Sequence, residues 1–137
     1  MFRKKIKGEI YLIRKKNKEW GYILFDRNIW CERKELFLRE EDYWEKPPYQ
    51  PHISLFTKEE VQKIPDDYEF SKSIEFILTG ETKIVNPQTW KDVYSCIFEI
   101  VECEEAEKIR QELGFGKFLR ENHEFHMTLG IKKSPNK

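Results

Sequence analysis

The sequence predicts a single α+β domain in which antiparallel strands predominate and helices lie outside them. Three observations support this fold class: the 137 residues match the usual size of one domain, about 100–150 residues, strand-type segments outnumber helix-type segments, and short turn signals separate successive strands. Hydrophobic residues make up only 39% of the chain, but ten Phe, six Tyr and four Trp supply large surfaces for a core. We therefore expect residues 1–137 to form one domain.

The first elements are expected to form a hairpin. Residues 8–16 and 20–26 are rich in β-branched and aromatic side chains, and the polar residues 17–19 separate them. Residues 30–45 fit neither periodicity well, so a charged helix and a short strand with a loop both stay open. The three prolines in residues 46–51 exclude a helix interior, because proline lacks a donor and makes the preceding residue extended.

The second half predicts alternating strands and helices. Residues 52–57 have strand composition, and Thr57 with Glu60 forms a capping box that begins a short helix ending at Ile64. The remaining elements follow from composition and end signals, with Gly80 and Asn86-Pro87 as interruptions and Gly114 as a C-cap: strands at 73–84, 93–102 and 125–132, and a helix at 104–113.

Charge and cysteine content limit the classes of partner. The chain has 25 basic and 25 acidic residues, and zero net charge argues against a protein that coats long duplex nucleic acid. Positive charge nevertheless gathers in the first eighteen residues, where only Glu9 is acidic, so this end could attract an anion. Three cysteines without CxxC spacing predict neither disulfides nor a zinc site. No apolar run approaches membrane length, and we expect a cytoplasmic protein without a cofactor.

Two short segments carry the chemistry. His52 and Ser54 are two positions apart in a predicted strand, as are His126 and Thr128, so each pair shares one face while the apolar neighbours face the core. Two imidazoles suit the proton transfers of phosphodiester cleavage, and two hydroxyls can donate to the charged phosphoryl oxygens without a metal. The alternative interpretation is a pair of half-buried strand histidines whose hydrogen bonds neighbouring hydroxyls satisfy.

The segments PHISL and FHMTL resemble the paired H-Φ-[ST]-Φ motifs of the two-histidine (2H) phosphoesterase superfamily. The resemblance implies a compact bilobal fold with antiparallel sheets around a central cleft, and metal-independent cleavage of phosphodiesters that carry an adjacent ribose hydroxyl or a 2′,3′-cyclic phosphate. His52 and His126 would be the acid and the base, in an order the resemblance does not assign. Ser54 stands where threonine is commoner in the family, but the hydroxyl is retained.

The resemblance also suggests substrates. Small viral members of the superfamily degrade signalling oligonucleotides, either 2′-5′ oligoadenylates or the cyclic oligonucleotides of bacterial anti-phage defence. This short chain is similar in scale, so small oligonucleotides that act as immune signals are expected ahead of RNA ends with 2′,3′-cyclic phosphate. A catalytically silent oligonucleotide-binding module is the alternative from another class.

Further residues are expected to bind substrate. Tyr11, Trp44 and Tyr49 are candidates for stacking on bases, and Lys132 is a candidate for contacting phosphate. Most of the aromatic residues in the first fifty positions are expected in the core. His123 is interpreted as a surface residue rather than a metal ligand, because no third ligand is spaced nearby.

Overall fold

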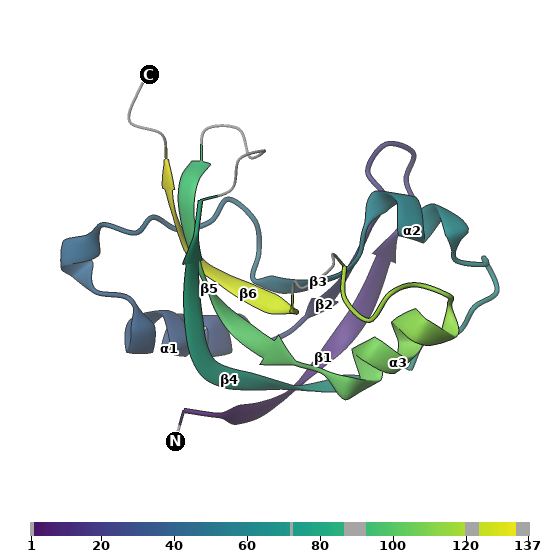
Figure 1. The fold of residues 1–137 in the computed structure, drawn as a ribbon, viewed down its shortest axis with the longest axis horizontal. Helices are drawn as coiled ribbons and strands as arrows, with labels where there is room; N and C mark the ends of the chain where they lie inside the picture. Colours follow the sequence, from purple (N-terminus) through teal and green to yellow (C-terminus); the bar gives the residue numbers. More distant parts are fainter. Residues whose placement is uncertain (1, 72, 87–92, 120–123, 134–137) are drawn as a thin grey trace.

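The structure, a computed structural model, describes residues 2–71, 73–86, 93–119 and 124–133. The six strands of this part of the chain are β1 (Lys4–Ile13), β2 (Trp20–Leu24), β3 (His52–Phe56), β4 (Ile74–Val85), β5 (Val93–Glu102) and β6 (His126–Lys133). The helices are α1 (Arg27–Phe37), α2 (Lys58–Lys63) and α3 (Glu104–Glu112), with a 3-10 turn at Glu40–Asp42. In Figure 1, α1 lies at one side of the sheet, and α2 and α3 lie at the other.

All pairings are antiparallel, in the order β1-β2-β3-β6-β5-β4, and β1 also pairs with β4, so the sheet closes into a barrel. Closure depends on Gly80, where β4 has a positive φ of 84° and its register with β5 shifts. The first half of β4 pairs with β1, and the second half extends beyond it beside β5. The α+β class and the antiparallel pairing are confirmed. We expected more than one sheet, but the strands form a single closed sheet. The division into two lobes stays a prediction.

The predicted hairpin forms with shifted ends. The first strand begins at Lys4 rather than Gly8, because residues 4–8 pair with β4. It ends at Ile13, and the second strand ends at Leu24 rather than Asp26, because the Asp26 carboxylate accepts a hydrogen bond from the Asn28 backbone and caps α1.

The ambiguous residues 30–45 contain most of α1. Trp30 and Arg33 are its buried residues, and a buried arginine interrupts the apolar periodicity that would have indicated a helix. Arg33 is satisfied by a buried ion pair with Glu99 of β5, and Glu99 also accepts from the Gly80 backbone at 2.8 Å. The same interaction therefore fixes α1 and the bend of β4.

The later helices match their end signals. The Thr57 hydroxyl accepts from the Glu60 backbone at 3.2 Å while the Glu60 carboxylate accepts from the Thr57 backbone at 3.0 Å, which confirms the capping box of α2. Gly114 follows α3 with a φ of 86°, as a C-cap residue requires. None of the helices in the described ranges is long and apolar enough to cross a membrane.

The three cysteines are free in the structure. Burial raises the pKa of the Cys96 and Cys103 thiols to about 11. Both are therefore neutral at ordinary pH, and neither has the thiolate character of a nucleophile.

Candidate active site

The motif strands alternate as the sequence predicts. Ile53 and Leu55 of β3 are fully buried, whereas His52 and Ser54 are half-buried. In β6, Met127 and Leu129 are fully buried, and His126 and Thr128 are half-buried. The apolar side chains thus anchor both strands in the core and leave imidazole and hydroxyl groups on the opposite face.

The register between β3 and β6 brings the two motifs together. Ile53 pairs with Met127 in an antiparallel ladder. One residue along, the same register sets Ser54 opposite His126 and His52 opposite Thr128, so each imidazole faces the hydroxyl of the other strand. Directly opposed Cβ atoms in such ladders lie about 4.5–5.5 Å apart and diagonal neighbours roughly 7–8 Å apart. The two histidines are diagonal neighbours, a separation that leaves room for one phosphate between them.

Both imidazoles are oriented by the same kind of hydrogen bond. His52 Nδ1 lies 2.7 Å from the Gln50 carbonyl oxygen, and His126 Nδ1 lies 3.1 Å from the Glu124 carbonyl oxygen. A carbonyl can only accept, so Nδ1 of each ring carries the proton and donates it. In this tautomer Nε2 of each ring is the unprotonated nitrogen, which is able to accept a proton.

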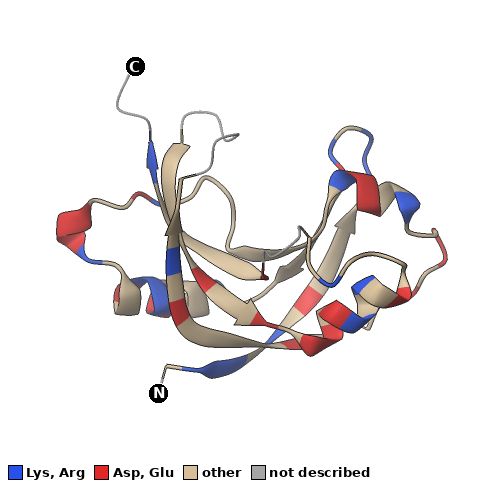
Figure 2. Cartoon of the chain, viewed as in Figure 1, with Lys and Arg blue, Asp and Glu red and all other residues tan. Residues whose placement is uncertain are grey.

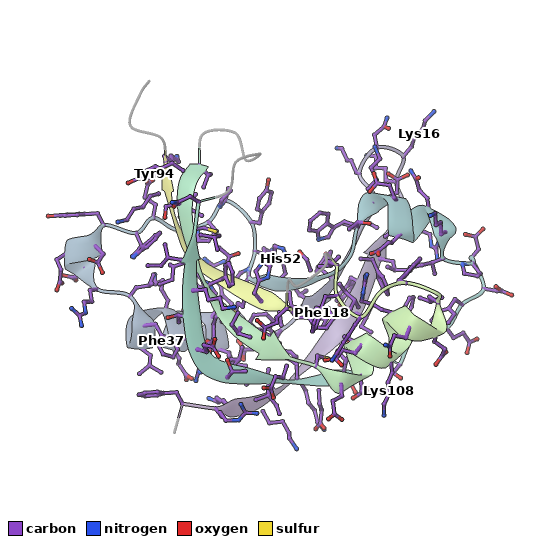
Figure 3. All side chains as sticks on the ribbon, in the orientation of Figure 1. Lys16, Phe37, His52, Tyr94, Lys108 and Phe118 are labelled. Carbon is purple, nitrogen blue, oxygen red and sulfur yellow. The ribbon has the colours of Figure 1, made fainter. Side chains whose placement is uncertain are left out.

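A cavity of about 820 Å³ opens over this face, near the middle of the molecule where Figure 3 labels His52. All four motif residues line it. The hairpin contributes Ile13, Trp20, Tyr22 and Leu24, and the proline-rich residues 47–51 form another wall, with Trp30, Val93 and Ile131 completing the lining. Its volume is within the usual range for small-molecule sites, about 300–1,000 Å³.

Three aromatic rings surround His52. Tyr22, Trp20 and Tyr49 approach its ring edge-to-face, with centroids at 5.8, 6.3 and 6.5 Å. Trp20 is 41% exposed and Tyr49 is 73% exposed, so both retain free ring surface. Such surface can stack on nucleobases for about 1–3 kcal/mol per base.

His126 has a different environment. Its ring is tilted by 35° against Phe98 of β5 at a centroid distance of 4.3 Å. Below it, the buried Trp30 donates from Nε1 to the Thr128 carbonyl at 2.9 Å and ties α1 to the motif strand. This half of the site is built from packed rings.

The predicted substrate-binding residues separate into two groups. Tyr49 lines the cavity, as its candidacy requires. Tyr11 lies one strand further out and stacks on Tyr22 at 6.0 Å, so it supports a lining residue. The Lys132 ammonium lies 4.5 Å from the centre of the Trp44 ring, so these two candidates contact each other. Neither is among the described residues that line the cavity.

Sequence reasoning missed Trp20, Tyr22, Trp30 and Phe98. Trp20 and Tyr22 were not among the predicted stacking residues, but β2 pairs with β3 and sets Tyr22 opposite Ser54. Their i, i+2 spacing places the two rings on one face of the strand, but only the register with β3 shows that this is the face of the motif. For Trp30 and Phe98, the sequence held no signal.

No group of three or more His, Cys, Asp or Glu side chains in the described ranges is arranged to hold a metal ion. The interpretation of His123 lies outside those ranges.

The arrangement has the parts of an acid–base site for phosphoryl chemistry: two imidazoles with defined tautomers and two hydroxyl donors around one point. The segment from residue 32 to residue 136 matches the family model 2H-SAK, described as Swiss Army Knife, 2H phosphoesterase domain. The match covers more than half of the chain and includes both motifs, so the chain belongs to the 2H phosphoesterase superfamily. No curated protein and no solved structure matches it.

The match begins inside α1. The β1–β2 hairpin, which contributes Trp20 and Tyr22 to the cavity, lies outside the matched segment.

Proposed function

We propose that this protein is a metal-independent phosphodiesterase that cleaves small RNA-type oligonucleotides, cyclic or 2′-5′ linked. The observation that carries this is the diagonal pair of histidines that line one cavity together with Ser54 and Thr128. Membership of the 2H phosphoesterase superfamily supports a phosphodiesterase-type reaction.

In the proposed reaction, one imidazole removes a proton from the ribose hydroxyl next to the scissile phosphate. The hydroxyl oxygen bonds to phosphorus, and the bond to the leaving oxygen breaks as the other imidazole donates its Nε2 proton to that oxygen. The Ser54 and Thr128 hydroxyls donate to the non-bridging oxygens, where charge accumulates. The products are a cyclic phosphate and an alcohol, unless water then opens the ring.

The lining of the cavity supports a small substrate with bases. Among the described residues that line the cavity, only histidine and tyrosine can ionise. Because the lining has no lysine or arginine, the cavity suits one phosphate rather than a polyanion. The exposed rings of Trp20 and Tyr49 suit nucleobases next to that phosphate. A cytoplasmic role in degrading immune signalling nucleotides is the biological setting that we propose.

The test is incubation with a substrate panel in EDTA, followed by chromatography. The panel contains cyclic di- and trinucleotides, 2′-5′ oligoadenylate, and RNA ending in 2′,3′-cyclic phosphate. We expect cleavage of small oligonucleotides, a bell-shaped dependence of rate on pH, and a loss of about 10²–10⁴-fold in kcat for His52→Ala and for His126→Ala. Lys108→Gln, an exposed change on α3, is the matched control and should keep full activity.

Three outcomes would change the proposal. Activity lost in EDTA and restored by a divalent ion would indicate a metal hydrolase. Cleavage of the RNA end alone would indicate an RNA-processing enzyme. Binding without turnover of any substrate would indicate an oligonucleotide-binding module.

A further inference from the structure

The turn between β1 and β2 joins two residues that line the cavity. Ile13 and Trp20 pair with each other at the end of the hairpin ladder, and both line the cavity. The turn that follows is closed by a hydrogen bond from the Lys18 backbone to the Lys15 carbonyl at 2.9 Å, with Asn17 at a φ of 67°. Lys16 at its tip is three residues from Ile13, roughly 10 Å along an extended chain.

Three lysines of this turn have no ion-pair partner among the described residues. Lys15, Lys16 and Lys18 are all exposed, and Figure 2 shows the tip in blue beside α2. In Figure 3, Lys16 is labelled at this tip, at the outer edge of the molecule. The turn is therefore a local concentration of positive charge in a chain whose net charge is zero.

The two residues that flank these lysines are held by α2 and the segment after it. Arg14 donates to the carbonyls of Ile64 and Pro65 at 3.0 and 3.1 Å and lies 3.4 Å from Asp66. On the other side, the Glu19 carboxylate accepts from the Gln62 amide of α2 at 3.2 Å. Both ends of the turn are thus fixed in place, and the one acid of the turn bonds to α2 rather than to the lysines.

The cavity and the turn complement each other. No lysine or arginine is among the described residues that line the cavity, so a second phosphate on a substrate would find no cation inside it. Trp20 lies between the two, with its ring 6.3 Å from His52 and its backbone next to the turn. A base stacked on Trp20 would direct its next phosphate out of the cavity and toward the lysines.

We propose that Lys15, Lys16 and Lys18 form an outer phosphate subsite for a phosphodiester beyond the scissile one. This inference rests on the proposed function for its substrate class. With this subsite, the protein should bind an oligonucleotide that has at least two phosphates more tightly than one that has only the scissile phosphate. The subsite belongs to the hairpin, outside the segment that matches the family model.

The test compares two triple variants with the same change in net charge. The first is Lys15→Gln/Lys16→Gln/Lys18→Gln, and the control is Lys5→Gln/Lys7→Gln/Lys108→Gln, which removes exposed lysines from β1 and α3. Each is assayed on a dinucleoside monophosphate and a trinucleoside diphosphate with the same linkage and bases. For the turn variant we expect KM for the diphosphate to rise roughly five- to tenfold, and the slope of log KM against log salt to fall by about 0.7.

For the monophosphate, we expect the turn variant to match the unmodified protein, and we expect the control variant to match it on both substrates. An equal rise in KM for both substrates, or no rise for the diphosphate at low salt, would overturn the outer subsite while leaving the proposed function intact. If the unmodified protein cleaves neither ligand, the proposed function fails, and the same comparison is made by equilibrium binding. A five- to tenfold weaker affinity of the turn variant for the diphosphate alone would then still support the subsite, and equal affinities would reject it.

Discussion

His52 of β3 and His126 of β6 carry the same motif and the same Nδ1 hydrogen bond to a carbonyl two residues earlier, but their surroundings differ. Three rings approach His52 edge-to-face, and two of them, Trp20 and Tyr49, are substantially exposed. The ring of Phe98 packs against the His126 ring and is itself half-buried. The motif groups are thus duplicated on two neighbouring strands, whereas among the described residues the exposed aromatic rings lie beside His52.

The two strands are also anchored differently. In β3, the Leu55 carbonyl accepts from Arg110 of α3 at 2.8 Å, and Arg110 forms a bidentate ion pair with Glu60 at 2.7 Å for both contacts. Burial of Glu60 opposes its ionisation, but the hydrogen bonds from Arg110 and from the Thr57 backbone outweigh burial and lower its pKa. In β6, the Thr128 carbonyl accepts from the neutral Trp30 indole. A charged, multiply bonded anchor from α3 therefore holds β3, whereas the neutral Trp30 indole bonds to the motif part of β6. The far end of β6 is held by backbone hydrogen bonds between Glu45 and Ile131 and by the ion pair of Lys133 with Glu45.

The largest expected effect tests whether the chemistry is in fact duplicated. Ser54→Ala and Thr128→Val each remove one hydroxyl from the site, and loss of one donor to a developing oxyanion typically lowers kcat about 10²–10³-fold. Because the register makes the two hydroxyls equivalent, we expect similar losses, measured by steady-state kinetics on the preferred substrate.

Ser54→Thr is the matched control, because it keeps the hydroxyl in the form that is commoner in the family, and its kcat should stay within a few-fold of the unmodified protein. A large loss of kcat for only one of the two hydroxyl deletions would show that the phosphoryl oxygens accept a hydrogen bond from only one of the two strands. The duplication would then be of sequence rather than of function.

An intermediate effect tests whether recognition is one-sided. Trp20→Ala and Tyr49→Ala remove stacking surface beside His52, and about 1–3 kcal/mol per base corresponds to a rise in KM of roughly 5- to 150-fold. Val93→Ala trims the cavity wall in the other half of the site, and KM should change less than about twofold.

Trp20→Phe and Tyr49→Phe keep a ring and should restore most of the affinity, with thermal unfolding as the check on folding. If Val93→Ala weakens binding as much as the two ring deletions, the base does not prefer the His52 side, and the comparison between the half-sites fails.

The four motif residues were predictable because strand periodicity is local. The i, i+2 spacing alone places an imidazole and a hydroxyl on one face, and the structure shows that alternation in both strands. The partners of each motif depend on register between strands far apart in the sequence, which periodicity does not determine. Tyr11 illustrates this, because it lies on the correct face but one strand away from the cavity lining, behind Tyr22.

The helix α1 and the closure of the barrel were not predicted, because both depend on contacts between residues far apart in the sequence. The buried Arg33 made α1 look like a charged, aperiodic segment, because its partner Glu99 lies in a strand much later in the chain. Closure of the barrel depends on the bend at Gly80, and a glycine in a strand signals an interruption without saying which strand will pair beyond it.

The smallest expected effect concerns the anchor of β6. Trp30→Phe keeps most of the buried ring but removes the indole donor to the Thr128 carbonyl, and one such hydrogen bond contributes about 1 kcal/mol to the free energy of unfolding. Chemical denaturation should show this decrease, while kcat should change only a few-fold, because the Ile53–Met127 pairing still sets the register of His126. A loss of kcat beyond about tenfold with the same small loss of stability would mean that the indole positions Thr128 for catalysis. The neutral anchor would then be part of the active site, and the two motif strands would differ in chemistry as well as in recognition.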